Sequence, residues 1–159
     1  DHGIHLSNGL GFSIDNRLLY YADSVARTIY RYQYDLRTGK VSNKRIYVRV
    51  PETQGIPDGL TVDSEDCVWS AQWYGECIIR YDPDGNVRNR IQLPVKQVSS
   101  LTFGGDDMTD IYITTAKDNW KSPVSPTGYD YDARNIGGGL YRCNVGIKGR
   151  REHYAAICS

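Results

Sequence analysis

The sequence predicts an all-β protein built from β-propeller blades, and three observations lead to this prediction. The 159 residues include 13 Tyr and 16 Gly, a composition that favours strands joined by tight turns over helices. One pattern of short apolar runs occurs three times along the chain. Turn-forming residues separate these runs, and four antiparallel strands repeated at about 40 to 50 residues are typical of propeller blades.

The first expected blade covers about residues 8–52, with strands expected at 8–15, 18–23, 28–32 and 44–50. Its turn signals are Asp15-Asn16 and the segment 37–40, Arg-Thr-Gly-Lys. The fourth strand is expected from the apolar run at 44–50. We therefore expect a meander of four antiparallel strands.

The second and third blades are expected at about 58–94 and 99–159, where the same order of runs returns. The second contains runs at 58–63, 67–71, 77–81 and 87–93, with a Pro-Asp-Gly-Asn turn after Asp82. The third contains runs at 99–104, 110–114 and 139–143 and a weaker one at 154–157. An ordinary β-sandwich is the alternative, but it does not require such regular repetition. We treat residues 1–159 as a single domain of three blades.

Composition excludes several classes of function. The 19 basic residues balance the 19 acidic ones, since 19 − 19 = 0, so no basic field favours nucleic acid or an anionic membrane. No apolar run has the length of a membrane span. No phosphate-binding glycine loop and no Gly-x-Ser-x-Gly elbow occurs.

The four cysteines show no Cys-x-x-Cys spacing. Cys67 and Cys77 fall at opposite ends of one expected blade, which disfavours a disulfide between them. We expect free thiols in a reducing compartment, and hence a cytoplasmic protein.

A series of short motifs follows in one order along nearly the whole chain. These motifs are Ser7-Asn8-Gly9-Leu10, Tyr21-Ala22-Asp23-Ser24, Tyr32-Gln33-Tyr34-Asp35, Ile56-Pro57-Asp58-Gly59-Leu60, Arg80-Tyr81-Asp82-Pro83-Asp84-Gly85, Phe103-Gly104-Gly105, Tyr112-Ile113-Thr114 and Gly138-Gly139-Leu140-Tyr141. Together they closely resemble the senescence marker protein, regucalcin and gluconolactonase family, in its C-terminal half. The resemblance implies a six-bladed propeller, of which this chain would form half, with one divalent metal at its centre and hydrolysis of sugar lactones or related esters.

The resemblance also implies metal ligands. Asn8 corresponds to the family's Asn in Asn-Gly-Leu, and Asp58 corresponds to its Asp in Pro-Asp-Gly. A third ligand of the family, a Glu near the N-terminus, has no counterpart in this sequence. The metal would be one divalent ion, Ca²⁺, Mg²⁺, Mn²⁺ or Zn²⁺.

The positions of Asn8 and Asp58 within the repeats also favour the two residues as metal ligands. Asn8 and Asp58 stand at equivalent positions, just before the first strand of successive units. Because first strands line the centre of a propeller, these side chains should converge near the axis. An amide oxygen and a carboxylate suit a hard cation, and Asp58 could also take a proton from an attacking water. The alternative is that Asn-Gly and Pro-Asp-Gly are simply turns.

Other residues are expected on the substrate side of the site. The third unit has Ser99 or Ser100 at the equivalent position, suited to bond a ligand or a water. Turns between second and third strands should surround the pocket mouth, which points to Asp23, Trp73 and Trp120. Asp23 could instead cap its turn. The long segment 116–137 is either a lid or a mobile surface loop.

Three blades do not close a ring, so a partner is expected to complete it. A second copy related by a two-fold axis would make a homodimer with two Asn8 and two Asp58 around the axis. A separate chain carrying the N-terminal half is the other possibility. The expected small-molecule partner is a lactone, and the alternative functions are a non-catalytic binding or assembly module and an inactive truncated family member.

Overall fold

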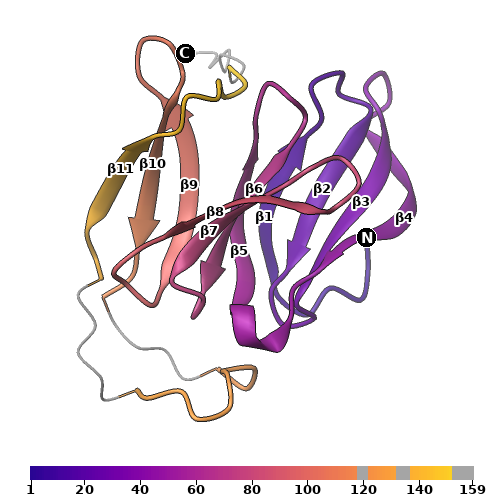
Figure 1. The fold of residues 1–159 in the computed structure, drawn as a ribbon. Helices are drawn as coiled ribbons and strands as arrows, with labels where there is room; N and C mark the ends of the chain where they lie inside the picture. The colour runs from indigo at the N-terminus through magenta and orange to yellow at the C-terminus, as the bar shows by residue number, and fades with distance from the viewer. Residues whose placement is uncertain (118–121, 132–136, 152–159) are drawn as a thin grey trace, which may run out of the picture.

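A computed structural model describes residues 1–117, 122–131 and 137–151 and shows three antiparallel sheets side by side (Figure 1). This confirms the predicted all-β fold of propeller blades. The first sheet contains β1 (Ser7–Phe12), β2 (Leu18–Asp23), β3 (Thr28–Asp35) and β4 (Lys40–Arg49). A short 3-10 turn, η1 (Glu52–Gln54), precedes β5 (Ile56–Val62), β6 (Val68–Trp73), β7 (Cys77–Tyr81) and β8 (Val87–Gln92). The third sheet contains β9 (Val98–Gly104), β10 (Asp110–Thr115) and β11 (Leu140–Asn144).

Spatial order follows sequence order within every sheet, as a meander requires. The third sheet has three strands among the described residues, and the run at 154–157 that we expected as its fourth strand lies outside them. β4 begins at Lys40, so the strand extends further toward the preceding turn than the expected start at 44. No helix in the described part of the chain is long and apolar enough to cross a membrane.

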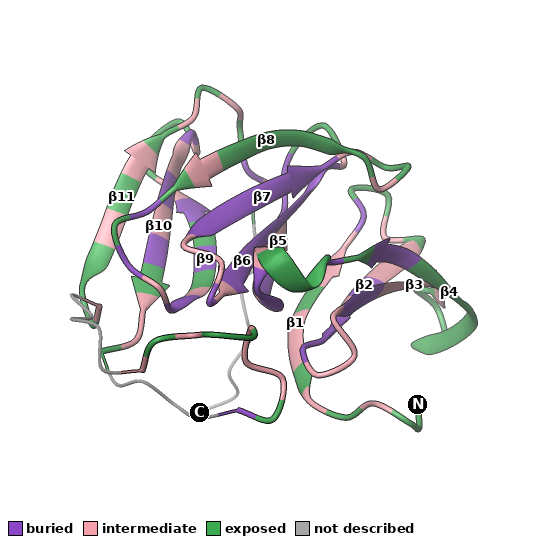
Figure 2. Cartoon of the chain, turned by 60° about the horizontal axis from the view of Figure 1, so that its bottom comes forward, coloured by how far each residue is buried: buried purple, intermediate pink, exposed green. Residues whose placement is uncertain are grey.

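Strands β6 and β7 of the second sheet are buried on both faces, whereas its outer strand β8 is largely exposed, and β6 shows how the sequence achieves this burial (Figure 2). Successive side chains of a strand point to opposite faces. Val68 therefore packs with Tyr20 and Ile29 of the first sheet, and Trp69 packs with Phe103 of the third. These two apolar layers hold the three sheets together, because burial of apolar surface is the main stabilising contribution to folding.

Glycines let neighbouring first strands approach closely. A Cβ atom at Gly9 of β1 would lie 2.5 Å from the backbone nitrogen of Leu60 in β5. A Cβ atom at Gly59 would lie 2.7 Å from Cα of Ser100 in β9. Only a residue without a side chain fits at either position. The starts of β1 and β5, where Asn8 and Asp58 stand, are consequently brought close together.

The segment after β11 ties the far ends of the sheets together. The backbone N–H of Ser64 donates to the carbonyl oxygen of Lys148, 2.8 Å away. Arg150 then reaches the first sheet, where its Nη1 lies 3.1 Å from the carbonyl oxygen of Phe12 and 2.9 Å from that of Ser13. Since Phe12 is the last residue of β1, this crossing lies at the opposite end of that strand from Asn8.

Candidate functional site

Asn8 and Asp58 line one pocket at the starts of β1 and β5. The pocket has a volume of about 180 Å³, and its remaining lining residues are Leu6, Ser24, Ile56 and Trp73. A larger groove of about 560 Å³ runs farther along the first strands and is lined by Leu10, Leu60 and Leu101, with Arg150 at its edge. No carboxylate lines that groove. The smaller pocket therefore combines the groups suited to metal or acid–base chemistry.

The carboxyl group of Asp58 is a weaker acid in this pocket than a carboxyl group in water. Burial raises the pKa of Asp58 to about 7, although hydrogen bonds from the Asn8 side chain and from the Gly59 backbone act in the opposite direction. None of these influences comes from a basic side chain. Burial disfavours the charged form, which a nearby positive charge would favour. A cation bound in this pocket would therefore stabilise the ionised form of Asp58.

Ser24 joins the two halves of this site, and sequence reasoning did not single it out. The Nδ2 atom of Asn8 donates to Ser24 Oγ at 3.2 Å. Ser24 Oγ in turn donates to the carbonyl oxygen of Pro57 at 2.7 Å. The available signal was its place in the turn after β2, one of the turns expected at the pocket mouth.

The serines of the third unit lie outside the pocket. Ser99 Oγ and Thr114 Oγ1 share a hydrogen bond of 2.8 Å between β9 and β10. Ser100 packs against Gly59. Neither serine is among the residues that line the pocket.

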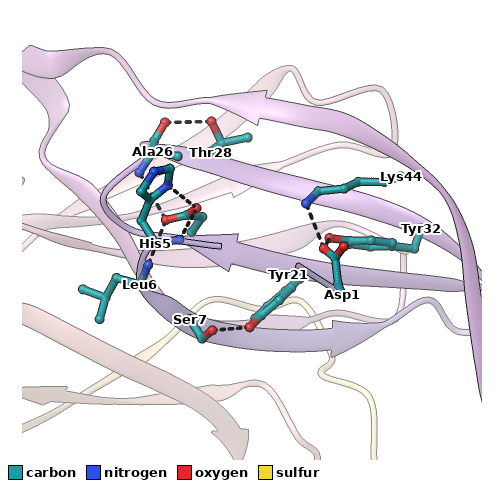
Figure 3. Close-up of polar contacts among 10 residues, drawn as sticks. Asp1, His5, Leu6, Ser7, Tyr21, Ala26, Thr28, Tyr32 and Lys44 are labelled. Atoms are coloured by element: carbon teal, nitrogen blue, oxygen red, sulfur yellow. Dashed lines mark hydrogen bonds and ion pairs between the residues drawn. The ribbon is translucent and has the colours of Figure 1, made fainter. Parts of the chain in front are cut away.

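Asp23 is fully buried and serves the turn that follows β2. Its carboxylate accepts backbone N–H bonds from His5 at 2.9 Å, from Leu6 at 3.2 Å and from Ala26 at 3.2 Å, and the dashed lines that leave His5 and Leu6 in Figure 3 mark two of them. Burial opposes its charge, but these hydrogen bonds outweigh that effect and lower the pKa of Asp23. Asp23 is not among the lining residues, and this geometry is that of the turn cap considered as its alternative role.

Trp73 lines the pocket, whereas Trp120 lies outside the described residues. The described part of the long segment, 122–131, lies at the lower end of the sheets in Figure 1. Arg27 donates from Nη2 to the carbonyl oxygen of Val124 and from Nη1 to that of Gly55. The rings of Tyr74 and Tyr129 meet edge to face, with centroids 4.6 Å apart. This part of the segment therefore contacts the first and second sheets.

The described residues contain no group of three or more His, Cys, Asp or Glu side chains that could hold a metal. A cation bound between Asn8 and Asp58 would need further donors from outside this set. Three thiols, those of Cys67, Cys77 and Cys143, are free, and Cys158 lies outside the described residues.

Comparison with known proteins identifies close relatives. The chain is 41% identical over 150 residues to the pentonolactonase XacC of Haloferax volcanii, covering 94% of this chain and 51% of that protein. Two solved structures are similar: a luciferin-regenerating enzyme (TM-score 0.83, 32% identity, 94% of this chain and 48% of that one) and a calcium-binding regucalcin from Agrobacterium tumefaciens (TM-score 0.80, 27% identity, 94% and 49%). The chain spans about half the length of these relatives.

A family model supports the same relationship. The model described as the SMP-30/gluconolactonase/LRE-like region matches residues 1–117, which include β1 to β10. Both proposed ligands, Asn8 and Asp58, lie within the match. The chain belongs to the SMP-30/gluconolactonase/LRE-like family.

Proposed function

We propose that this chain supplies part of the active site of a metal-dependent hydrolase of sugar lactones or related esters. Asn8 and Asp58 are the metal ligands that it contributes, and Asp58 is also the general base. The observation that carries the proposal is the meeting of these two side chains in one pocket. The pentonolactonase among the relatives supports the substrate class, and the calcium-binding regucalcin supports a divalent cation.

The donor set fits a hard cation. Carboxylate and amide oxygens are ligands that Ca²⁺, Mg²⁺ and Mn²⁺ favour. Burial raises the pKa of Asp58, and no basic side chain offsets the charge of its ionised form. A bound cation would offset this charge and would polarise the lactone carbonyl and activate water.

The residues of this chain have separate parts in the proposed reaction. Asp58 accepts a proton as water adds to the carbonyl carbon of the lactone. The ring C–O bond then breaks, and the leaving oxygen receives the proton, so that lactone and water become one hydroxy acid. Trp73 forms a wall of the pocket and orients the lactone beside Asp58.

A second polypeptide completes the site in this proposal. The simplest candidate is another copy of the chain, which would form a six-bladed homodimer and bring two Asn8 and two Asp58 to the axis. A separate chain with the N-terminal half is the other candidate. Light scattering of the purified chain at micromolar concentration distinguishes the two candidates. A dimer that forms without an added chain supports the homodimer, whereas a monomer contradicts the homodimer.

The function is tested by metal titration and lactone hydrolysis with the wild type and the variants Asn8→Ala and Asp58→Ala. We expect both variants to lose divalent binding and turnover. Ser99→Ala is the matched control, because Ser99 lies at the equivalent position of β9 outside the pocket. Unchanged binding and hydrolysis in Asp58→Ala would contradict the assignment.

Exposed apolar side chains favour a second candidate function, a non-catalytic assembly module. Leu10 and Leu36 of the first sheet region are 58% and 68% exposed, and Leu140 of the third sheet is 69% exposed. Leu10 and Leu36 line the same groove, and exposed apolar residues that gather on one surface mark interaction sites. A stable complex with a partner but without metal or turnover would support this candidate over the hydrolase.

A further inference from the structure

We infer that Ser24 is a positioning residue that holds both proposed metal ligands in one arrangement across the interface of the first two sheets. The inference rests on the proposed function, because it assigns Ser24 a role toward Asn8 and Asp58. Its basis is a chain of two hydrogen bonds that runs from the Asn8 amide through the Ser24 hydroxyl to the backbone beside Asp58.

The first step is the orientation of the Asn8 amide. Ser24 Oγ donates its only hydrogen to the carbonyl oxygen of Pro57, so it meets Asn8 as an acceptor. Only the Nδ2 atom of an Asn side chain donates, and this atom lies 3.2 Å from Ser24 Oγ. With its Nδ2 atom directed to Ser24, Asn8 keeps its Oδ1 atom for a cation.

The second step is the position of Asp58. Pro57 precedes Asp58 directly in β5, so the bond of 2.7 Å to its carbonyl oxygen fixes the backbone next to the carboxylate. Ser24 itself belongs to the first sheet, in the turn between β2 and β3. One hydroxyl group thus sets the distance between a ligand of the first sheet and a ligand of the second.

The third step is the rigidity of Ser24. Its exposed fraction is 1%. Its backbone N–H donates to the carbonyl oxygen of Leu6 at 3.1 Å, and its own carbonyl oxygen accepts from Arg27 at 3.1 Å. Polar groups buried away from water depend on hydrogen-bond partners within the protein. Removal of the hydroxyl would leave Asn8 Nδ2 and the Pro57 carbonyl each short of one partner.

Loss of this support should appear in metal affinity. Residues that orient metal ligands typically contribute about 10- to 100-fold to affinity. We therefore expect Ser24→Ala to weaken binding of Ca²⁺ and Mn²⁺ to the full chain by about this factor in calorimetric titration. Ser24→Thr keeps the hydroxyl and should restore most of the affinity. In NMR spectra of the metal-free protein, slow hydrogen exchange of the Asn8 side-chain amide should be lost in Ser24→Ala and retained in Ser24→Thr.

Ser13→Ala is the matched control. Ser13 is also a fully buried serine of the first sheet region, and its Oγ accepts from the backbone N–H groups of Arg17 and Leu18 at 3.1 and 2.9 Å. It follows the far end of β1. Ser13→Ala should lower unfolding stability as Ser24→Ala does, but leave metal affinity and the Asn8 amide unchanged.

The outcomes separate the two proposals. If Asn8→Ala and Asp58→Ala abolish metal binding while Ser24→Ala binds as tightly as the wild type, the metal site stands and the role of Ser24 is overturned. That role is overturned as well if Ser13→Ala weakens binding as much as Ser24→Ala. If the wild type binds neither Ca²⁺ nor Mn²⁺, the proposed metal site fails and the role of Ser24 fails with it.

Discussion

Arg27 and Val124 stand 97 residues apart in the sequence, and a hydrogen bond from Nη2 of Arg27 to the carbonyl oxygen of Val124 joins them. The other terminal nitrogen of Arg27 binds the carbonyl oxygen of Gly55. One guanidinium group therefore connects the turn after β2, the segment before β5 and the long segment between β10 and β11. All three connections lie on the side of the molecule where the pocket of Asn8 and Asp58 is formed.

Arg27→Ala should release the segment 122–131 from the first two sheets. The variant loses both charge-assisted bonds, each of which is stronger than a neutral one. We expect faster amide hydrogen exchange in 122–131 and faster chymotrypsin cleavage at Tyr129 and Tyr131. Arg31→Ala is the control, because Arg31 also bridges the two sheets through the carbonyl oxygen of Pro83 but is remote from this segment. Equal protection in both variants would rule out the anchoring role of Arg27.

Asp63→Asn should destabilise the second sheet strongly. Asp63 is fully buried, and its Oδ2 atom lies 2.7 Å from Nε of Arg80 and 2.8 Å from Nε1 of Trp69. Loss of the buried partner of an ion pair costs about 3 kcal/mol or more of unfolding free energy, because the buried Arg80 then keeps only its exposed partner Glu65. Urea denaturation measures this loss.

The matching control for that ion pair is Glu65→Gln. Glu65 binds the same Arg80 at 2.6 Å, but its side chain is 64% exposed. Exposed ion pairs contribute less than about 1 kcal/mol. If both substitutions lowered stability equally, the burial of Asp63 would not be the cause.

Gly59→Ala should separate β5 from β9. A Cβ atom at Gly59 would lie 2.7 Å from Cα of Ser100, which is backbone and cannot rotate away. Overpacking of this kind costs about 1 to 3 kcal/mol. Gly139→Ala is the control, since its Cβ atom would make an ordinary contact 3.5 Å from the ring of Tyr141. Thermal unfolding of the two variants compares the costs, and an unchanged midpoint for Gly59→Ala would contradict the close approach.

Much of the fold follows from local sequence, but the support of the site does not. Strand positions were predictable because turn residues separate apolar runs, and the pairing of Asn8 with Asp58 follows from their equal register in two repeats. The contact of Ser24 with Pro57 depends on how closely neighbouring sheets approach, which the glycines of different strands decide together. The anchoring by Arg27 is a contact across 97 residues that no repeat pattern contains.

The stability of the metal-free protein should depend on the ionisation of Asp58. Its pKa rises from 3.8 in the unfolded chain to about 7 in the folded protein. Between these values the folded state binds more protons than the unfolded state, so the contribution of Asp58 to stability falls as pH rises from about 4 to about 7 and then stays constant. Asp58→Asn cannot ionise. It should equal the wild type near pH 4 and exceed it at pH 8 by up to about 4 kcal/mol, the free energy of about three pKa units.

Urea denaturation at several pH values in the presence of a chelator measures this difference between variant and wild type. Asp107→Asn is a control with the opposite sign, because hydrogen bonds from Thr109 lower the pKa of Asp107. That variant should lose stability relative to the wild type as pH rises toward about 4, and the difference should then stay constant up to pH 8. Addition of Ca²⁺ or Mn²⁺ should then stabilise the wild type at pH 8 and leave Asp58→Asn almost unchanged, because the cation binds the ionised carboxylate of the folded state. A constant difference between Asp58→Asn and the wild type across this range would show that the carboxyl group ionises as freely in the pocket as in water.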